Sequence, residues 1–301
     1  MTNAFALAQR YLFLLLAVFE TTVGLSAQQA GDSPVKIFIL AGQSNMHGHG
    51  EISPVDSPGT LDYIVANDPE GDYQFLVDGA GDWVVRDDVW IRDQGSNLGG
   101  LTAGYGRNTG EIGPELGFGH TIGDLNEQQV LIVKAAWGGK SLAVDFRPPS
   151  SGGDTGFYYN EILRLVNEAT DNLGTYFPDY DDGGYEIAGF GWHQGFNDRV
   201  VTGRSAEYET NMANFIRDIR SSENGLGVAD LPFVIATTGM GGEADYTEVE
   251  LAQLAMAEAT EYPEFDGNVA VVDTRTPYEG LEFWQPSKFS PSSQGYHWNR
   301  N

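Results

Sequence analysis

Five short apolar runs, rich in β-branched residues, are spaced along the chain and predict buried strands. They cover residues 35–41, 130–136, 186–192, 232–238 and 268–273. Segments near 113–126, 157–174, 205–221 and 245–260 show helical spacing, and the clearest places four apolar side chains on one face: Tyr208, Met212, Phe215 and Ile219. Strands that alternate with helices predict an α/β fold, a three-layer α/β/α sandwich around a central, mostly parallel five-stranded sheet.

The segment from about 48 to 112 interrupts this alternation, because it is rich in Gly and Asp and has no long apolar run. A structureless insert of that length is unusual unless it is functional or packs on itself. Its stretch 104-GYGRNTG-110 lacks the glycine spacing and the βαβ context of a dinucleotide site. We therefore expect an ordered loop excursion near the site, within a single domain spanning residues 28–301.

The first 27 residues have the pattern of an export signal. Arg10 precedes the short apolar run 11-YLFLLLAVF-19, and small residues near Ala27 offer a cleavage site. The run is too short to span a bilayer, and no apolar run of membrane length follows it. We expect a signal peptide over 1–27 and a secreted or periplasmic protein, with an uncleaved membrane anchor as the alternative.

Composition narrows the function classes further. The chain has no cysteine, which excludes disulfides, thiolate metal sites and a cysteine nucleophile. It has 16 Lys and Arg against 43 Asp and Glu, for a formal net charge of −27. Such a surface repels nucleic acid and anionic membranes, so we expect no nucleic-acid partner and no membrane contact after signal removal. A neutral substrate fits this charge better than an anionic one.

Polar and glycine-rich blocks follow three of the predicted strands, where the site of a parallel sheet lies. Ser44, after the first strand, could act as a nucleophile if a base assists it, or it could merely cap a helix. Gly138 and Gly139, after the second, could bring a backbone amide close to an oxyanion or form a plain turn. Asn197, after the third, has a neutral amide suited to an oxyanion hole, although turns also favour asparagine.

A serine hydrolase also needs a general base, and only five histidines are present. His47 and His49 are too near Ser44 in sequence to approach it easily from across a cleft, and His120 falls in a predicted helix. His193 is a possible base, although its position favours a role in shaping the site. His297, in a loop after the last strand, is the best candidate base. The candidate side chains that line the site are His193, Gln43, Gln194 and Gln294.

These blocks resemble a known family of enzymes. The order 42-GQSNM-46, 138-GG-139, 193-HQG-195 and His297 is similar to that of the SGNH hydrolases, most closely the sialate O-acetylesterase and acetylxylan esterase branch, carbohydrate esterase family 6. The stretch 112-IGPELGFG-119 also resembles that branch, and the resemblance covers roughly residues 35–301. It implies a flavodoxin-like SGNH fold and a serine esterase that removes O-acetyl groups from carbohydrate without metal or cofactor.

The resemblance also implies a role for each matched residue. Ser44 would attack the ester carbonyl and His297 would take its proton. The oxyanion would be held by the backbone amides of Ser44 and of Gly138 or Gly139, together with the side chain of Asn197. Losing one such donor typically lowers turnover by about 10²–10³.

Two departures leave the third catalytic group open. Many relatives have Asp three residues before the histidine, where this chain has Gln294, and others have Glu where it has Phe196. Either Asp198 or Asp273 could orient His297 instead. A backbone carbonyl or that of Gln294 could also fix its tautomer, which would make a Ser–His dyad.

Three further expectations concern rival functions and the substrate. His47-x-His49 could belong to a metal-dependent hydrolase, and 179-DYDDGG-184 faintly resembles a calcium loop without its later Glu. A carbohydrate-binding protein without catalysis is the other alternative, with aromatic side chains that could stack on sugars: Trp83, Trp90, Trp137 and Trp192. The expected partner is acetylated carbohydrate, with a preference for neutral plant or algal polysaccharide. Relatives usually continue into a closing helix, whereas this chain ends four residues after His297. Either the protein lacks that helix or the sequence is truncated. A missing helix would expose apolar sheet surface, and we would then expect lower stability or a partner that covers this face.

Overall fold

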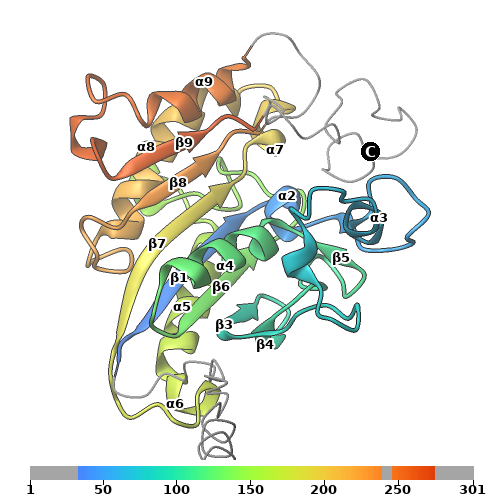
Figure 1. Cartoon of the computed structure of the whole chain (residues 1–301). Coiled ribbons are helices and arrows are strands. Elements are labelled where there is room, and N and C mark those ends of the chain that lie inside the picture. Colours follow the sequence, from blue (N-terminus) through green and yellow to red (C-terminus); the bar gives the residue numbers. More distant parts are fainter. Residues whose placement is uncertain (1–32, 239–245, 275–301) are drawn as a thin grey trace, which may run out of the picture.

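The computed structural model describes residues 33–238 and 246–274. Its central sheet consists of seven strands: β1 (Val35–Gly42), β3 (Arg86–Asp93), β4 (Leu98–Leu101), β6 (Val130–Ala136), β7 (Tyr185–His193), β8 (Phe233–Ala236) and β9 (Val269–Val272). They lie in the order β4-β3-β6-β1-β7-β8-β9, as Figure 1 shows. Among these seven described strands, β3 and β4 pair antiparallel and the other neighbours are parallel. The predicted α/β class and the mostly parallel sheet are therefore confirmed.

The predicted count of five strands is wrong, because the segment between 48 and 112 adds β3 and β4 to one edge of the sheet. Its strand β3, 86-RDDVWIRD-93, runs parallel to β6 with Val89 opposite Val130. Charged residues flank its short apolar centre, so alternation alone does not reveal a strand. Arg92 becomes buried there because its guanidinium is paired with Glu168 at 2.6 Å.

Helices connect the strands in the predicted alternation, and four of them match predicted segments: α4 (Pro114–Leu125), α5 (Phe157–Asp171), α8 (Ser205–Arg220) and α9 (Glu248–Ala255). The shorter helices are α2 (Ser44–His47), α3 (Leu61–Ala66), α6 (Leu173–Tyr176), α7 (Phe196–Arg199) and the 3-10 helices η1 (Gln74–Leu76), η2 (Pro149–Ser151) and η3 (Pro263–Phe265). The strands β2 (Gly50–Glu51) and β5 (Glu111–Ile112) form a separate antiparallel pair.

Alternate residues of β1 enter two different cores. Ile37 and Ile39 pack in the larger core with residues of α5, α8 and α9. Phe38 and Leu40 point to the opposite face, where α4 covers β6 and β3. The predicted apolar face of α8 is confirmed, because all four of its members are fully buried: Tyr208, Met212, Phe215 and Ile219. Within the described ranges, no helix is long and apolar enough to cross a membrane.

Candidate active site

The blocks after β1, β6 and β7 meet at one edge of the sheet, because these three strands are adjacent and parallel. Gly42, the last residue of β1, lies opposite Ala136 on one side and His193 on the other. Two hydrogen bonds extend the pairing beyond the strands. The Trp137 amide donates to the Gly42 carbonyl at 3.0 Å, and the Gln43 amide donates to the His193 carbonyl at 3.0 Å.

The conformation at Gly42 requires glycine. Its φ is +152°, and a Cβ atom at this position would collide with the carbonyl oxygen of His193. The close approach of β1 and β7 turns the chain sharply into α2, which begins at Ser44. Gln43 is the N-cap residue of α2, so the alternative in which Ser44 merely caps the helix is wrong. Ser44 lies at the carboxyl edge of the sheet with 5% of its surface exposed.

Gln43 connects the Ser44 block to the block after β7. Its side-chain oxygen accepts hydrogen bonds from the backbone amides of Gly195 at 3.1 Å and Asn197 at 3.3 Å. It also accepts one from the side chain of Gln194 at 3.3 Å. The Gln43 side chain is buried, so these bonds form in a low-dielectric setting where a satisfied polar network rigidifies its members. Gln43 thus fixes the position of Asn197 relative to Ser44.

The paired glycines after β6 form an exposed loop beside this network. A Cβ atom at Gly138 or Gly139 would meet nothing within 4 Å, and Gly139 has a φ of +71°. The side-chain amide of Asn197 donates to the Gly139 carbonyl, and that of Gln194 donates to the Lys140 carbonyl at 2.9 Å. The loop is therefore held against the block after β7 by two side-chain amides.

Asp198 has a structural set of partners. Its carboxylate accepts the backbone amides of Leu142 and Ala143, each at 2.8 Å, and the side chain of Gln194 at 2.6 Å. Burial raises the pKa of Asp198 above its usual range, and these hydrogen bonds partly offset that rise. Its carboxylate orders the chain that follows the paired glycines.

Asp273 lies immediately after β9 and has different surroundings. Its carboxylate accepts a hydrogen bond from the hydroxyl of Tyr246 and a longer one, at 3.4 Å, from that of Thr237. The side chain is only partly buried. The residues His297 and Gln294 lie outside the described residues.

Comparison with known proteins assigns the chain to a family. The family model described as "Carbohydrate esterase, sialic acid-specific acetylesterase" matches residues 34–280. The chain belongs to this carbohydrate esterase family. The assignment agrees with the resemblance seen in the sequence blocks, and it identifies the protein as a carbohydrate esterase. No curated protein sequence matches the chain.

Three solved structures are similar to this carbohydrate esterase. A protein from Arabidopsis thaliana is 18% identical, with a TM-score of 0.54 and coverage of 82% of this chain and 89% of its own. A carbohydrate acetylesterase from Xanthomonas citri is 14% identical, with a TM-score of 0.47 and coverage of 79% and 49%. The protein NanS is also 14% identical, with a TM-score of 0.44 and coverage of 83% and 79%. At these identities the Arabidopsis structure supports the fold alone.

Two histidines near the candidate site have lowered pKa values: His193 is buried and His47 is partly buried. Burial lowers the pKa of His193 to about 4, although a hydrogen bond with the Thr237 backbone opposes this. Burial and the nearby Lys134 ammonium lower the pKa of His47 to about 4. Both imidazoles are therefore neutral at pH 7. His120 lies on α4, as predicted.

The two rival ion sites receive no support from the geometry. The rings of His47 and His49 lie 6.2 Å apart, nearly perpendicular to each other. In the part of the chain that the structure describes, no group of three or more His, Asp or Glu side chains converges to hold a metal ion. The acidic stretch 179–184 contains a turn in which the Gly184 amide donates to the Tyr180 hydroxyl at 3.0 Å.

A buried ion pair below Ser44 is the main feature that the sequence interpretation missed. Lys134 of β6 and Glu115 of α4 are both 0% exposed and lie 2.7 Å apart. The Lys134 ammonium also donates to the backbone carbonyls of His47 at 2.9 Å and Tyr105 at 2.6 Å. A lysine inside the apolar run 130-VLIVKAA-136 was the available signal, because a charge in a central parallel strand needs a buried partner.

This ion pair ties three segments together. His47 is the last residue of α2, and Tyr105 belongs to the segment between 48 and 112. The second Glu115 oxygen accepts the backbone amide of Gly113 at 2.7 Å, just before α4. The ammonium has three hydrogens, and each of them has an acceptor. Lys134 therefore holds the helix that begins with Ser44 against both α4 and the inserted segment.

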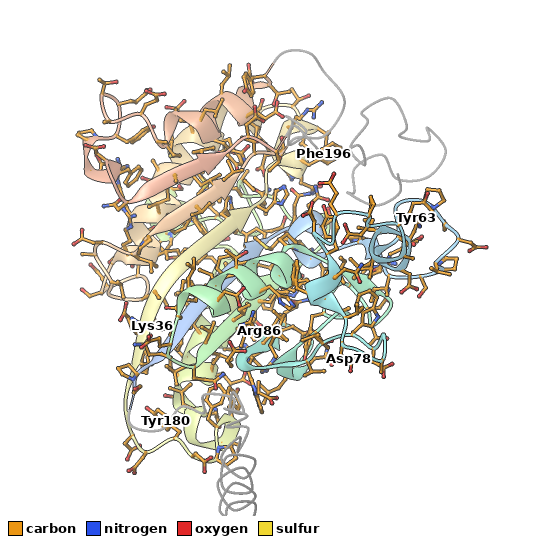
Figure 2. The ribbon with its side chains drawn as sticks, viewed as in Figure 1. Lys36, Tyr63, Asp78, Arg86, Tyr180 and Phe196 are labelled. Atoms are coloured by element: carbon orange, nitrogen blue, oxygen red, sulfur yellow. The ribbon has the colours of Figure 1, made fainter. Side chains whose placement is uncertain are left out.

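Figure 2 places this edge within the molecule. Phe196 of α7 lies on the same side as α2, whereas Lys36 and Tyr180 lie toward the opposite end of the strands. Phe196 stands where some relatives have Glu, and the Arg199 guanidinium lies 5.8 Å from its ring centroid. This position therefore contributes an aromatic side chain, and no carboxylate, to the candidate site.

Proposed function

We propose that the protein is a serine esterase that removes O-acetyl groups from carbohydrate, with Ser44 as nucleophile and His297 as general base. The observation that carries this proposal is the convergence of three separate blocks at one sheet edge. Gly42 is bonded to Trp137, Gln43 to the block that contains Asn197, and Asn197 to Gly139. These contacts support the proposal because the serine and the oxyanion donors of an acyl-transfer site would have to lie at one such edge.

The proposed reaction follows from the chemistry of these groups. The Ser44 oxygen attacks the ester carbonyl carbon, and His297 takes the hydroxyl proton. The tetrahedral intermediate collapses to an acetyl-enzyme when His297 returns that proton to the departing sugar hydroxyl. Water then attacks the acetyl group, with the same histidine as base, and acetate leaves from Ser44.

The proposed oxyanion hole uses donors from three segments: the loop after β6, the start of α2 and α7. The exposed backbone of Gly138 and Gly139 can approach a substrate closely, and the Ser44 amide lies at the start of α2. Asn197 donates one hydrogen to the Gly139 carbonyl, and its side-chain nitrogen carries a second. Donors that are fixed before the reaction stabilise developing charge without reorganisation.

We propose Asp273 over Asp198 as the carboxylate that orients His297. Asp198 is fully buried and its carboxylate already accepts three hydrogen bonds from the loop after β6 and from Gln194. Asp273 is partly exposed at the carboxyl end of β9, next to the segment of chain that leads to His297. Its hydroxyl partners, on Tyr246 and Thr237, would hold the carboxylate in a defined orientation.

The substrate proposal is an O-acetylated sugar, with neutral polysaccharide preferred over sialylated chains because of the net charge of −27. Export from the cytoplasm stays part of this proposal, since the predicted signal peptide lies outside the described residues.

The test compares wild type with Ser44→Ala, using p-nitrophenyl acetate and a panel of acetylated glycans, with acetate release measured by mass spectrometry. We expect hydrolysis in the wild type, a loss of at least about 10³-fold in Ser44→Ala, and no effect of a chelator. Activity that depends on a chelatable metal would support a metal hydrolase. Absence of turnover with retained glycan binding would support a carbohydrate-binding protein.

A further inference from the structure

Three aromatic side chains form a continuous run from the end of β6 to the surface. The ring centroids of Trp137 and Tyr158 are 4.7 Å apart, and those of Tyr158 and Phe157 are 5.1 Å apart with the rings perpendicular. Phe157 is 66% exposed, whereas Trp137 and Tyr158 are partly buried. We call these three residues the aromatic ridge.

The buried side of the aromatic ridge rests on the core. Phe146 is fully buried and its ring lies 6.2 Å from that of Trp137 and 5.8 Å from that of Tyr158. The Tyr158 amide donates to the Asp145 carbonyl at 2.9 Å, which fixes the first turn of α5 against the loop after β6. Trp137 and Tyr158 are therefore supported by the core and have little conformational freedom to lose when a ligand binds, and Phe157 packs edge-on against Tyr158.

The aromatic ridge begins at the candidate active site. The Trp137 amide donates to the Gly42 carbonyl, two residues before Ser44, and Trp137 is followed directly by Gly138 and Gly139. Single exposed hydrophobic side chains are common and need no explanation. Phe157 differs because it extends a supported row of rings that leads away from the proposed oxyanion loop.

The chemistry of the ridge suits a sugar ring. Aromatic faces bury the apolar C–H face of a pyranose, and a few polar groups beside them fix its hydroxyls. Lys140 supplies such a group: its ammonium lies 4.7 Å from the Tyr158 ring centroid and 3.7 Å from the Asp145 carboxylate. Because Asp145 balances the charge of Lys140, this surface has no strong preference for an anion.

We propose that the aromatic ridge is a subsite that binds a pyranose ring of the glycan adjacent to the acetylated sugar. The proposal rests on the proposed esterase function, which supplies the reason for a glycan chain to cross this edge of the sheet. Two sources share this ring chemistry, a neutral polysaccharide and a sialylated glycan. The charge balance at Lys140 favours the neutral chain.

The kinetic test compares Phe157→Ala with Tyr185→Ala, a matched aromatic control. Tyr185 is 49% exposed and is the first residue of β7, at the opposite end of the sheet from Ser44. Acetylated xylose, acetylated xylotetraose and O-acetylated sialyl-lactose serve as substrates, with p-nitrophenyl acetate as the small ester. We expect Phe157→Ala to raise KM for acetylated xylotetraose about three- to tenfold relative to Tyr185→Ala, with kcat little changed. Phe157→Trp should restore the wild-type KM.

A binding test separates this subsite from the proposed function. Xylotetraose without acetyl groups is titrated into Ser44→Ala protein, with and without Phe157→Ala. Weaker binding after the second substitution supports the subsite whether or not Ser44 is the nucleophile. Equal binding by both proteins, or equal KM for Phe157→Ala and Tyr185→Ala, overturns the subsite while the Ser44→Ala result on p-nitrophenyl acetate still decides the function. A KM change confined to sialyl-lactose would overturn the preference for neutral chains.

Discussion

The Lys134 ammonium has three acceptors, of which Glu115 supplies the carboxylate and two backbone carbonyls supply the rest. Replacing Glu115 with Gln removes that carboxylate and leaves the positive charge of Lys134 buried without a counterion. Both carboxylate oxygens accept in the native protein, one from Lys134 and one from the Gly113 amide, each at 2.7 Å. Glutamine supplies one acceptor and one NH₂ group, so a donor must face a donor. Breaking a buried ion pair in this way typically destabilises a protein by about 3–5 kcal/mol.

The expected loss is large enough to measure by thermal unfolding. At roughly 2–4 °C per kcal/mol for a domain of this size, Glu115→Gln should lower Tm by about 6–20 °C. The matched control is Glu264→Gln, which removes an equivalent Glu from the exposed pair with Arg217, where both side chains are nearly half exposed. Exposed ion pairs contribute about 0–1 kcal/mol to stability, so the Tm of the control variant should be close to that of the wild type. Equal Tm values for the two variants would refute the reasoning.

Esterase activity gives a second measurement of the same ion pair. Because Lys134 donates to the last carbonyl of α2, its loss would shift that helix and displace Ser44, the proposed nucleophile. A misplacement of about 1 Å can reduce turnover roughly 10²-fold. The double variant Lys134→Met/Glu115→Leu removes both charges and should recover part of the stability. This double variant should still hydrolyse p-nitrophenyl acetate slowly at 20 °C, because the His47 carbonyl still lacks its hydrogen-bond donor. Full recovery of turnover would show that Lys134 has only a stabilising role.

Three further outcomes are expected. Asn197→Ala should lower kcat about 10²–10³-fold on every ester, and an unchanged kcat would exclude it from the oxyanion hole. Asp198→Asn should lower Tm, because a buried backbone amide that it now accepts would lose its acceptor, at a cost of about 1–3 kcal/mol. Asp273→Asn should instead lower kcat and leave Tm nearly unchanged. The reverse pattern would identify Asp198 as the acid that orients His297. The folded-state pKa values of His193 and His47, about 4, lie below the unfolded value near 6.5, so the stability that their neutral forms contribute is present above pH 6.5 and is lost as pH falls toward 4. Urea unfolding at pH 7 and pH 4.5 measures this, and equal midpoints would contradict it.

Much of the fold could be predicted, because the spacing of apolar residues indicates which segments form buried strands and helices. Each predicted strand coincides with an observed one, and α8 buries the face its spacing indicated. Strand β3 could not be predicted, because the carboxylate that balances the buried charge of Arg92 is on α5, 76 residues later in the chain. Pairing between distant charges leaves no local pattern in the sequence.

The candidate site was predictable to the level of blocks and less so to the level of atoms. The rule that parallel strands present their sites at the carboxyl edge places Ser44, Gly139 and Asn197 together. It does not separate residues that touch a substrate from residues that hold the loops. Gln43 was expected to line the site and Asp198 was one of two candidates to orient His297, yet their side-chain oxygens accept buried backbone amides and the Gln194 side chain.

The reason that Gln43 and Asp198 hold loops is the cost of burying polar groups without hydrogen bonds. A loop that turns sharply at the edge of a sheet leaves backbone amides buried without strand partners, and each must find an acceptor. Gln43 accepts the amides of Gly195 and Asn197, and Asp198 accepts those of Leu142 and Ala143. Side chains that already have these partners cannot turn toward a substrate without leaving a donor unpaired, at about 1–3 kcal/mol for each group. Ser44 is not the cap of α2, because Gln43 occupies the N-cap position. A rigidly held Gln43 is therefore compatible with the proposal that Ser44 is the nucleophile.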